Sequence, residues 1–186
     1  SNFYNRARTA HIRIDEVNFD PEKVTVSVSK NGVVTKLKNN FSKDGNTYVM
    51  DYVFSDDADY ILTVTCRDKA DNKANDYSSG KFTVDTTAPV LEVSYDNNSA
   101  QNGTYYNASR TATIRVEEHN FDASRVNIAV TSEDGTSAAP GASGFTSNGD
   151  THVATVNFSA DGKFRIRVSA TDSAGNTASN TVDDSF

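Results

Sequence analysis

The sequence predicts an all-β chain that folds as two tandem β-sandwiches joined by a short linker, and two observations predict it. The first is an internal repeat, because residues 3–20 return as residues 105–122 at a shift of 102 positions. The second is an alternation of apolar and polar residues along most of the chain, with no segment of helical spacing. A chain of 186 residues with a period of about 100 suits two domains, each large enough to keep its own core.

The repeat continues beyond its first block with a small offset. Residues 41–74 match residues 145–178 at a shift of 104 positions, so two residues are inserted between the matched blocks. The insertion falls within residues 135–144, a weakly matching segment rich in Ala, Gly and Ser, which is interpreted as a loop. The predicted domains are residues 1–86 and 87–186.

The alternation places the expected strands in order along each copy, with the apolar residues on the buried face. In the first copy these are Ala10, Ile12 and Ile14, then Val24, Val26 and Val28, then Tyr48, Met50, Tyr52 and Phe54, and then Tyr60, Leu62, Val64 and Cys66. In the second copy they are Ala112, Ile114 and Val116, then Val126, Ile128 and Val130, then Ala154, Val156 and Phe158, and then Phe164, Ile166, Val168 and Ala170.

The segment between the copies is predicted to be a last strand, a linker and a first strand. Residues 81–85 and 90–95 have the composition of strands, and residues 86–89 lie between them. Pro89 holds this linker extended, and so few residues leave little room for independent tumbling of the two domains.

Short strands separated by turns, several in each copy of about 100 residues, predict an immunoglobulin-like topology. Asp57 and Tyr60 stand before a strand in the pattern of a tyrosine corner, in which the hydroxyl bonds to nearby backbone. The second copy has Phe164 at that position and lacks the hydroxyl. The chain has no Trp and a single cysteine, Cys66, so no disulfide forms within it and the cores hold the domains. Cys66 is predicted to be a small buried apolar residue rather than a reactive thiol.

Composition argues against several classes of function. A formal net charge of −7 disfavours nucleic acid, which is bound through clustered Lys and Arg. The apolar runs are too short for a membrane span, so no membrane contact is expected of this segment. His11, His119 and His152 align with Thr113, Val17 and Tyr48, so no histidine is shared by the two copies, and all three are expected to be solvated. Since no nucleophile-elbow pattern is present either, the sequence predicts a protein that is not an enzyme.

Two loops of each copy gather acidic and amide side chains. In an immunoglobulin-like sandwich the loops after the second strand and before the last strand meet at the N-terminal end of the module, next to the preceding linker. Oxygen ligands that converge in this way suit Ca²⁺, which takes six to eight. The alternative interpretation is that Asn and Asp are turn formers that bond to nearby backbone amides. Phe19 and Phe121, in the same loops, are expected to anchor them to the core. The candidate calcium ligands are Asp85, Glu118, Asn120, Asp122, Asp172 and Asn176.

Three features together resemble a known family. The run from Val84 to Pro89, the Asp57 to Tyr60 pattern and the turns 68–72 and 172–176 are similar to the bacterial Ig-like repeats of large Gram-positive surface proteins. The resemblance implies an extracellular protein, secreted or attached to the cell wall, whose partners include neighbouring Ig-like modules of the same chain. Such repeats serve as stalks, adhesins or accessory modules of secreted enzymes.

A copied module suits a spacer or a multivalent surface, because reach and avidity grow with copy number. We therefore expect a non-catalytic stalk, spacer or adhesin segment. One alternative is a binding module for a host extracellular glycoprotein, for example an immunoglobulin, or for a glycan; another is an accessory domain of a secreted glycan-active enzyme. Ligand specificity is expected where the copies differ, at residues 36–40 and 135–144. The aromatic residues available to a glycan are Tyr77, Tyr95, Tyr105 and Tyr106, of which Tyr105 and Tyr106 are expected to pack structurally.

The two copies differ at their ends. The first has no counterpart of residues 90–95 and is expected to lack its opening strand, strand A. The second ends where its last strand is expected to run, so that strand is predicted to be truncated. Each module is therefore expected to have an exposed sheet edge, open to strand addition by another chain.

Overall fold

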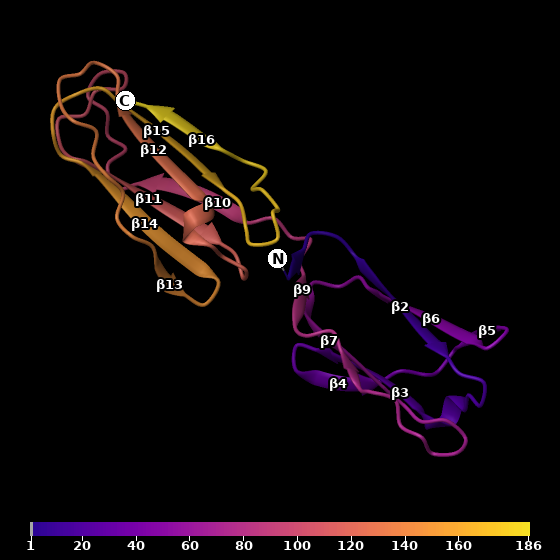
Figure 1. The fold of residues 1–186 in the computed structure, drawn as a ribbon. Coiled ribbons are helices and arrows are strands. Elements are labelled where there is room, and N and C mark those ends of the chain that lie inside the picture. The colour runs from indigo at the N-terminus through magenta and orange to yellow at the C-terminus, as the bar shows by residue number, and fades with distance from the viewer. Residues whose placement is uncertain (1) are drawn as a thin grey trace. The chain divides into compact units, whose positions relative to one another are not determined.

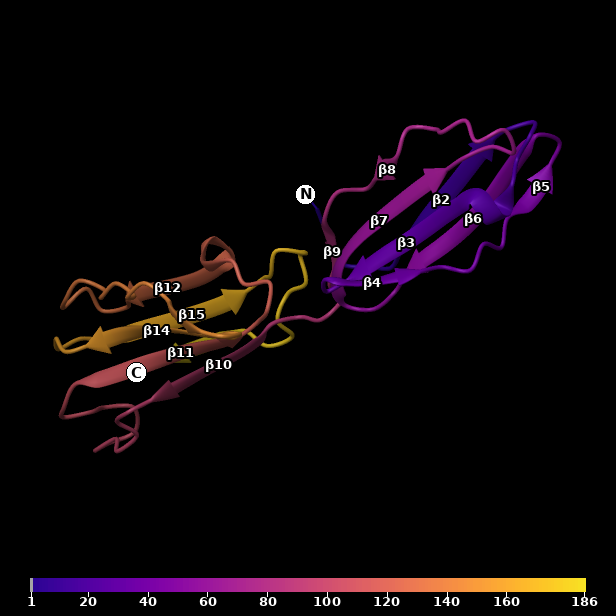
Figure 2. The ribbon, with the colours of Figure 1, turned by 90° about the horizontal axis from the view of Figure 1, so that it is seen from below.

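The structure is a computed structural model and describes residues 2–186. It is nearly all β, and the helical segments of these residues are the short 3-10 helices Pro21–Lys23 and Ala123–Arg125. The chain divides into two compact units, the first ending at Thr87 and the second comprising Ala88–Phe186. Each unit contains two layers of strands (Figures 1 and 2). The predicted all-β class is confirmed.

The first unit contains two sheets. One has the order β1-β9-β7-β3-β4, with β8 also paired to β7, and the other has the order β2-β6-β5. β1 runs parallel to β9, and the other pairs are antiparallel. The strands are β1 (Phe3–Tyr4), β2 (Arg8–Asp15), β3 (Val24–Lys30), β4 (Val33–Lys36), β5 (Ser42–Asp44), β6 (Thr47–Phe54), β7 (Ala58–Cys66), β8 (Tyr77–Ser78) and β9 (Phe82–Val84).

The core of the first unit lies between these sheets. Successive side chains of a strand point to opposite faces, so the apolar positions of each strand form one buried row. The β2-β6-β5 sheet contributes Ile12, Met50 and Phe54, and the other sheet contributes Val24, Val26, Val28, Leu62, Phe82 and Val84.

The second unit also contains two sheets, both entirely antiparallel, with the orders β10-β11-β14-β13 and β12-β15-β16. Leu91, Ile114, Val156, Ile166 and Val168 belong to the core between them. The strands are β10 (Val90–Tyr95), β11 (Arg110–Glu117), β12 (Val126–Ser132), β13 (Thr146–Asn148), β14 (Thr151–Phe158), β15 (Phe164–Ala170) and β16 (Val182–Ser185).

The units differ in which strands form the sheet edges. In the second unit β10 is the edge strand and pairs with β11, whereas in the first unit β2, the equivalent of β11, is itself the edge strand of its sheet. Among the described residues, β2 therefore has one partner strand, β6, whereas β11 has two, β10 and β14. In the other sheet of the first unit, β4 is the edge strand and pairs with β3, while in the second unit β12, the equivalent of β3, is itself an edge strand. Residues 135–144 form no strand and make one isolated bridge, between Ala142 and Val156, as expected of a loop.

Two details near the last strands bear on the sequence predictions. The Tyr60 hydroxyl donates to the carbonyl oxygen of Asp56 at 3.0 Å, so the predicted tyrosine-corner bond is present. In the second unit, where the last strand was expected to be truncated, β16 forms and is followed by Phe186. Phe186 exchanges two backbone hydrogen bonds with Phe164, at 2.8 and 3.0 Å, just as Phe82 lies opposite Tyr60 in the first unit.

Candidate functional site

The loop after β11 positions Glu118. Its carboxylate is buried and accepts a hydrogen bond from the backbone N–H of Asn120 at 2.7 Å. The backbone N–H of Glu118 itself donates to the carbonyl of Asp150 at 2.8 Å, which fastens the loop to the turn between β13 and β14. A side chain that bonds to an amide two residues further on closes a tight local turn.

The turn after β15 positions Asp172, which is 1% exposed. Its Oδ1 accepts from the backbone N–H groups of Gly175 and Asn176 at 2.7 and 2.8 Å, and its Oδ2 accepts from the Asn176 amide at 2.8 Å. The backbone N–H of Ser173 donates to the carbonyl of Asn120 at 3.0 Å and so joins this turn to the Glu118 loop. The two predicted loops of the second unit therefore meet.

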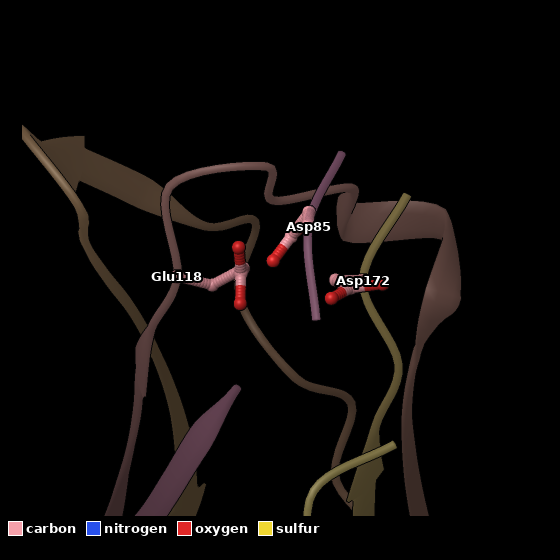
Figure 3. Close-up of side chains that lie close together, drawn as sticks. All are labelled: Asp85, Glu118 and Asp172. Carbon is pink, nitrogen blue, oxygen red and sulfur yellow. The ribbon is translucent and has the colours of Figure 1, made fainter. Parts of the chain in front are cut away.

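Glu118 and Asp172, both of the second unit, form one carboxylate group. Figure 3 labels both side chains, and each offers an oxygen within 4.8 Å of the other. Asp85 follows β9 and is 4% exposed; its Oδ1 accepts from the backbone N–H of Thr87 at 3.1 Å. Two buried carboxylates this close repel each other when both are ionised, so a bound cation would stabilise the pair of Glu118 and Asp172.

The remaining predicted ligands serve the loops themselves. Asp122 caps the 3-10 helix Ala123–Arg125, accepting from the Ser124 backbone N–H at 3.0 Å and from its hydroxyl at 2.6 Å. These bonds, chiefly the one from the Ser124 hydroxyl, lower the pKa of Asp122. The Asn176 side-chain amide donates a hydrogen bond to the Asp172 carboxylate, and the Asn120 backbone carbonyl accepts one from the backbone N–H of Ser173. Asp122 thus lies outside the carboxylate group, and the two amides support it.

The first unit repeats the loop bonds of the second. Glu16 accepts from the Asn18 backbone N–H at 2.7 Å, and Asp68 accepts from the backbone and side chain of Asn72 at 2.9 and 2.8 Å. The side-chain bond from Asn72 is the main reason that the pKa of Asp68 is lowered. Asp20 caps its 3-10 helix as Asp122 does. These residues therefore form turns in both units, as the alternative interpretation requires.

His152 was expected to be solvated, and this is wrong, since it is buried beside the Glu118 loop. Its Nε2 lies 2.9 Å from the Glu118 carbonyl oxygen, which can only accept, so Nε2 carries a proton, and Nδ1 faces the Ser147 hydroxyl at 2.7 Å. The ring stacks on Phe121 at 3.8 Å, as Tyr48 stacks on Phe19 in the first unit. The alignment of His152 with an aromatic residue was the signal that could have revealed its burial.

The other histidines are exposed as expected. His11 lies 2.8 Å from the Asp51 carboxylate, and His119 lies 2.9 Å from that of Asp150. Phe19 is 6% exposed, which confirms its predicted role as a loop anchor.

Two further residues differ from expectation. Cys66 is half-buried rather than buried, and burial raises the pKa of its thiol. Tyr105, expected to pack, is 76% exposed, whereas Tyr106 packs against Phe186 and under the Arg110 guanidinium. Tyr77 is also exposed, so Tyr77 and Tyr105 are the predicted aromatic residues that reach the surface of their units.

Comparison with known proteins identifies no family. No family model matches the chain, and no curated protein matches it. Among residues 2–186, the structure has no helix with the length and apolar character that a membrane crossing needs.

Proposed function

We propose that this chain is a load-bearing spacer, a stalk segment of two immunoglobulin-like modules from a bacterial surface or secreted protein. The observation that carries the proposal is the parallel pairing of β1 with β9, the first and last strands of the first unit. Phe3 lies opposite Thr83 and Tyr4 lies opposite Val84. The backbone N–H groups of Thr83 and Asp85 donate to the carbonyls of Asn2 and Tyr4 at 2.8 and 2.9 Å.

Parallel pairing of these two strands decides how the unit meets a pull on its ends. Tension draws β1 and β9 in opposite directions along their common axis, so their hydrogen bonds are loaded together. In an antiparallel pair pulled apart from its open end, the bonds would break one after another. The geometry of the first unit therefore suits a module that stays folded while the chain is stretched.

Side chains reinforce the same junction. The Tyr4 ring meets Phe82 edge to face at 6.0 Å, and the Arg8 guanidinium lies 4.6 Å from the Tyr4 ring centre and 4.5 Å from that of Phe82. Cation–π contacts of this kind contribute about 0.5–1 kcal/mol at exposed sites. The Asp57 carboxylate accepts from the Thr86 backbone N–H at 2.8 Å and the Thr87 hydroxyl at 2.5 Å, which secures the chain just after β9.

The contacts that the two copies share also support a scaffold role. Arg110 lies 4.4 and 4.5 Å from the ring centres of Tyr106 and Phe186, and Arg8 lies at the similar distances of 4.6 and 4.5 Å from those of Tyr4 and Phe82. The repeated loop bonds of Glu16 and Glu118 are likewise internal to each unit. The repeat has thus kept the residues that hold a module together, which is what a spacer needs.

The proposal is tested by stretching single molecules of the whole chain and of a variant that lacks residues 1–5. The deletion removes β1, so the force needed to unfold the first unit should fall clearly. The second unit serves as the control in the same molecule, and its unfolding force should not change. If the first unit unfolds at the same force with and without β1, the load-bearing proposal is wrong.

We propose calcium as a ligand of the second unit, because Glu118 and Asp172 are buried together in one carboxylate group. The carboxylate oxygens are hard ligands of the kind that Ca²⁺ binds, and water would supply the rest of its six to eight. Bound Ca²⁺ at 100 times its Kd would stabilise the unit by about 2.7 kcal/mol, or roughly 10 °C in Tm.

Melting the chain with Ca²⁺ and with a chelator tests this second proposal. The chelator should lower the Tm of the second unit, and Glu118→Gln should remove the difference. Glu16→Gln is the matched control, since Glu16 makes the equivalent loop bond in the first unit. Equal melting temperatures with Ca²⁺ and chelator would exclude a calcium site.

A further inference from the structure

Some asparagines of the chain are followed directly by glycine, and each such pair lies at a tight turn. The pairs begin at Asn31, Asn102 and Asn148. Because glycine has no side chain, its backbone can approach neighbouring groups closely. At such a pair the backbone nitrogen of the glycine can reach the side-chain carbonyl carbon of the asparagine. This approach is the one that spontaneous deamidation of asparagine needs.

Deamidation has two steps and consumes only water. In the first step the backbone nitrogen of the glycine gives up its proton and bonds to the side-chain carbonyl carbon of the asparagine. The bond from that carbon to the side-chain nitrogen breaks, and this nitrogen leaves as ammonia, which leaves a five-membered cyclic imide. In the second step water opens the imide at one of its two carbonyl carbons and yields aspartate or isoaspartate. Ammonia is lost and water is gained, and nothing is oxidised or reduced.

Asn148 lies where this reaction meets little resistance from the fold. It is the last residue of β13, a strand of 3 residues at the edge of its sheet, and it lies opposite Thr151. Asn148 and Gly149 are both exposed, and among residues 2–186 no hydrogen bond holds the Asn148 side chain. Ring closure has to turn Asn148 out of its extended conformation, and the end of a short edge strand opens locally at low cost.

Asn31 is held more firmly, although it is also exposed. It lies in the turn between β3 and β4, with φ of +50°, and Gly32 follows with φ of +84°. The Oδ1 of Asn31 accepts a hydrogen bond from the backbone N–H of Asp59 at 2.9 Å. The backbone N–H of Asn31 donates to the Asp59 carbonyl, also at 2.9 Å. Ring closure at Asn31 must break the side-chain bond and pull the turn away from β7.

The first unit shows that an aspartate fits the turn of Asn148. At the shift of 104 positions the equivalent residue is Asp44, which lies opposite Thr47 as Asn148 lies opposite Thr151. The glycines that follow have φ of +60° and +59°. Each turn is also fastened by a backbone bond to a loop glutamate, from Glu16 at 2.9 Å and from Glu118 at 2.8 Å. Isoaspartate would instead lengthen the backbone by one methylene and disturb this pairing.

We propose that Asn148 is a site of spontaneous deamidation in the folded chain, whereas the fold protects Asn31. The aspartate product gives the second unit the same aspartate–glycine turn that the first unit has at Asp44. The reaction adds a negative charge at the exposed end of β13. The proposal depends on neither the load-bearing role nor the calcium site, because it needs only this turn and water.

The test incubates the whole folded chain at mildly alkaline pH, which favours loss of the glycine amide proton. The chain is then digested under mildly acidic conditions, and its peptides are separated and weighed by mass spectrometry. The Asn148 peptide should deamidate at least about fivefold faster than the Asn31 peptide, because one more hydrogen bond must break at Asn31. The Asn102 peptide is read separately in the same digest and does not enter the comparison.

The same incubation in guanidinium chloride is the control for the fold. The Asn31 and Asn148 peptides should then react at closely similar rates, because the fold no longer holds either pair. Asn148→Gln should remove the product at this position, since glutamine would have to close a larger ring, and Asn148→Asp supplies the reference peptide for the aspartate product. Equal rates at Asn31 and Asn148 in the folded chain would overturn the proposal. A difference between the two peptides that persists unchanged in the denatured chain would also overturn it.

Discussion

The hydroxyl of Tyr60 is present in the first unit and absent at the equivalent position of the second, so its contribution to stability can be measured. It donates to the Asp56 carbonyl, whereas Phe164 stands at the equivalent place in the second unit. Tyr60→Phe should lower the free energy of unfolding of the first unit by about 1 kcal/mol, because one intramolecular hydrogen bond is lost. Chemical denaturation followed by near-ultraviolet circular dichroism measures this. Phe164→Tyr is the reciprocal change and should not destabilise the second unit to that extent; a Tyr60→Phe variant as stable as the parent would contradict the role of the bond.

Asp183 gives the second unit a defined response to acid. Hydrogen bonds from Arg165 at 2.6 and 2.7 Å, and then from Arg167, lower its pKa from 3.8 to about 2. A carboxyl group whose pKa is lowered by folding stabilises the folded state at pH values above its ordinary pKa of 3.8. This contribution disappears as the pH falls towards about 2. Asp183→Asn should therefore lower Tm at pH 6 and have no effect near pH 2. Melting curves of the parent and the variant between pH 2 and pH 6 test this prediction. An equal loss of Tm at both pH values would exclude the charge of Asp183 as the cause.

At the level of single residues, the sequence predicted side chains whose role depends on their near neighbours. Tyr60 bonds four positions away, and a local pattern revealed this bond. Glu118 was predicted only as a calcium ligand, although its bond to an amide two positions away is also local. His152 was mispredicted because its partners are distant in sequence. A buried imidazole needs an acceptor and a donor, and the Glu118 carbonyl that supplies the first lies 34 positions earlier.

The turns between paired strands provide a test at the level of elements. Gly45 and Gly149 link β5 to β6 and β13 to β14, with φ of +60° and +59°, a backbone conformation that other residues adopt at a cost. Gly149→Ala should destabilise the second unit by about 1–2 kcal/mol, although a Cβ there would meet no atom within 4 Å. Gly144→Ala is the matched control, because Gly144 is equally unobstructed and lacks a positive φ. Equal stability of the two variants would contradict this account of the turn.

Most strands could be predicted because each has one buried face and therefore alternates. β2, β3, β6 and β7 and their equivalents were all recognised in this way. β1, β4 and the parallel β1–β9 pairing were not, because β1 is two residues long and the partner of a strand is set by contacts distant in sequence. For the carboxylate group, the sequence predicted the convergence of two loops, but it could not separate Asp122, which caps its own helix.

For the molecule as a whole, the repeat specifies two units with separate cores and a few residues between β9 and β10. The units are unequal in one respect that matters under load. The first pairs its opening and closing strands directly, whereas β10 and β16 of the second lie in different sheets. Among the described residues, the two units should therefore differ in mechanical strength while sharing the same pattern of core and turns.

Stretching the intact chain by its two ends tests the central claim most directly. At about 3.6 Å per residue, the 99 residues of the second unit release about 40 Å more chain than the 87 of the first, so the two unfolding events can be told apart. The load-bearing account predicts two separate events, the longer one at lower force and the shorter one, from the first unit, at higher force. The reverse order, equal forces or a single event would contradict it.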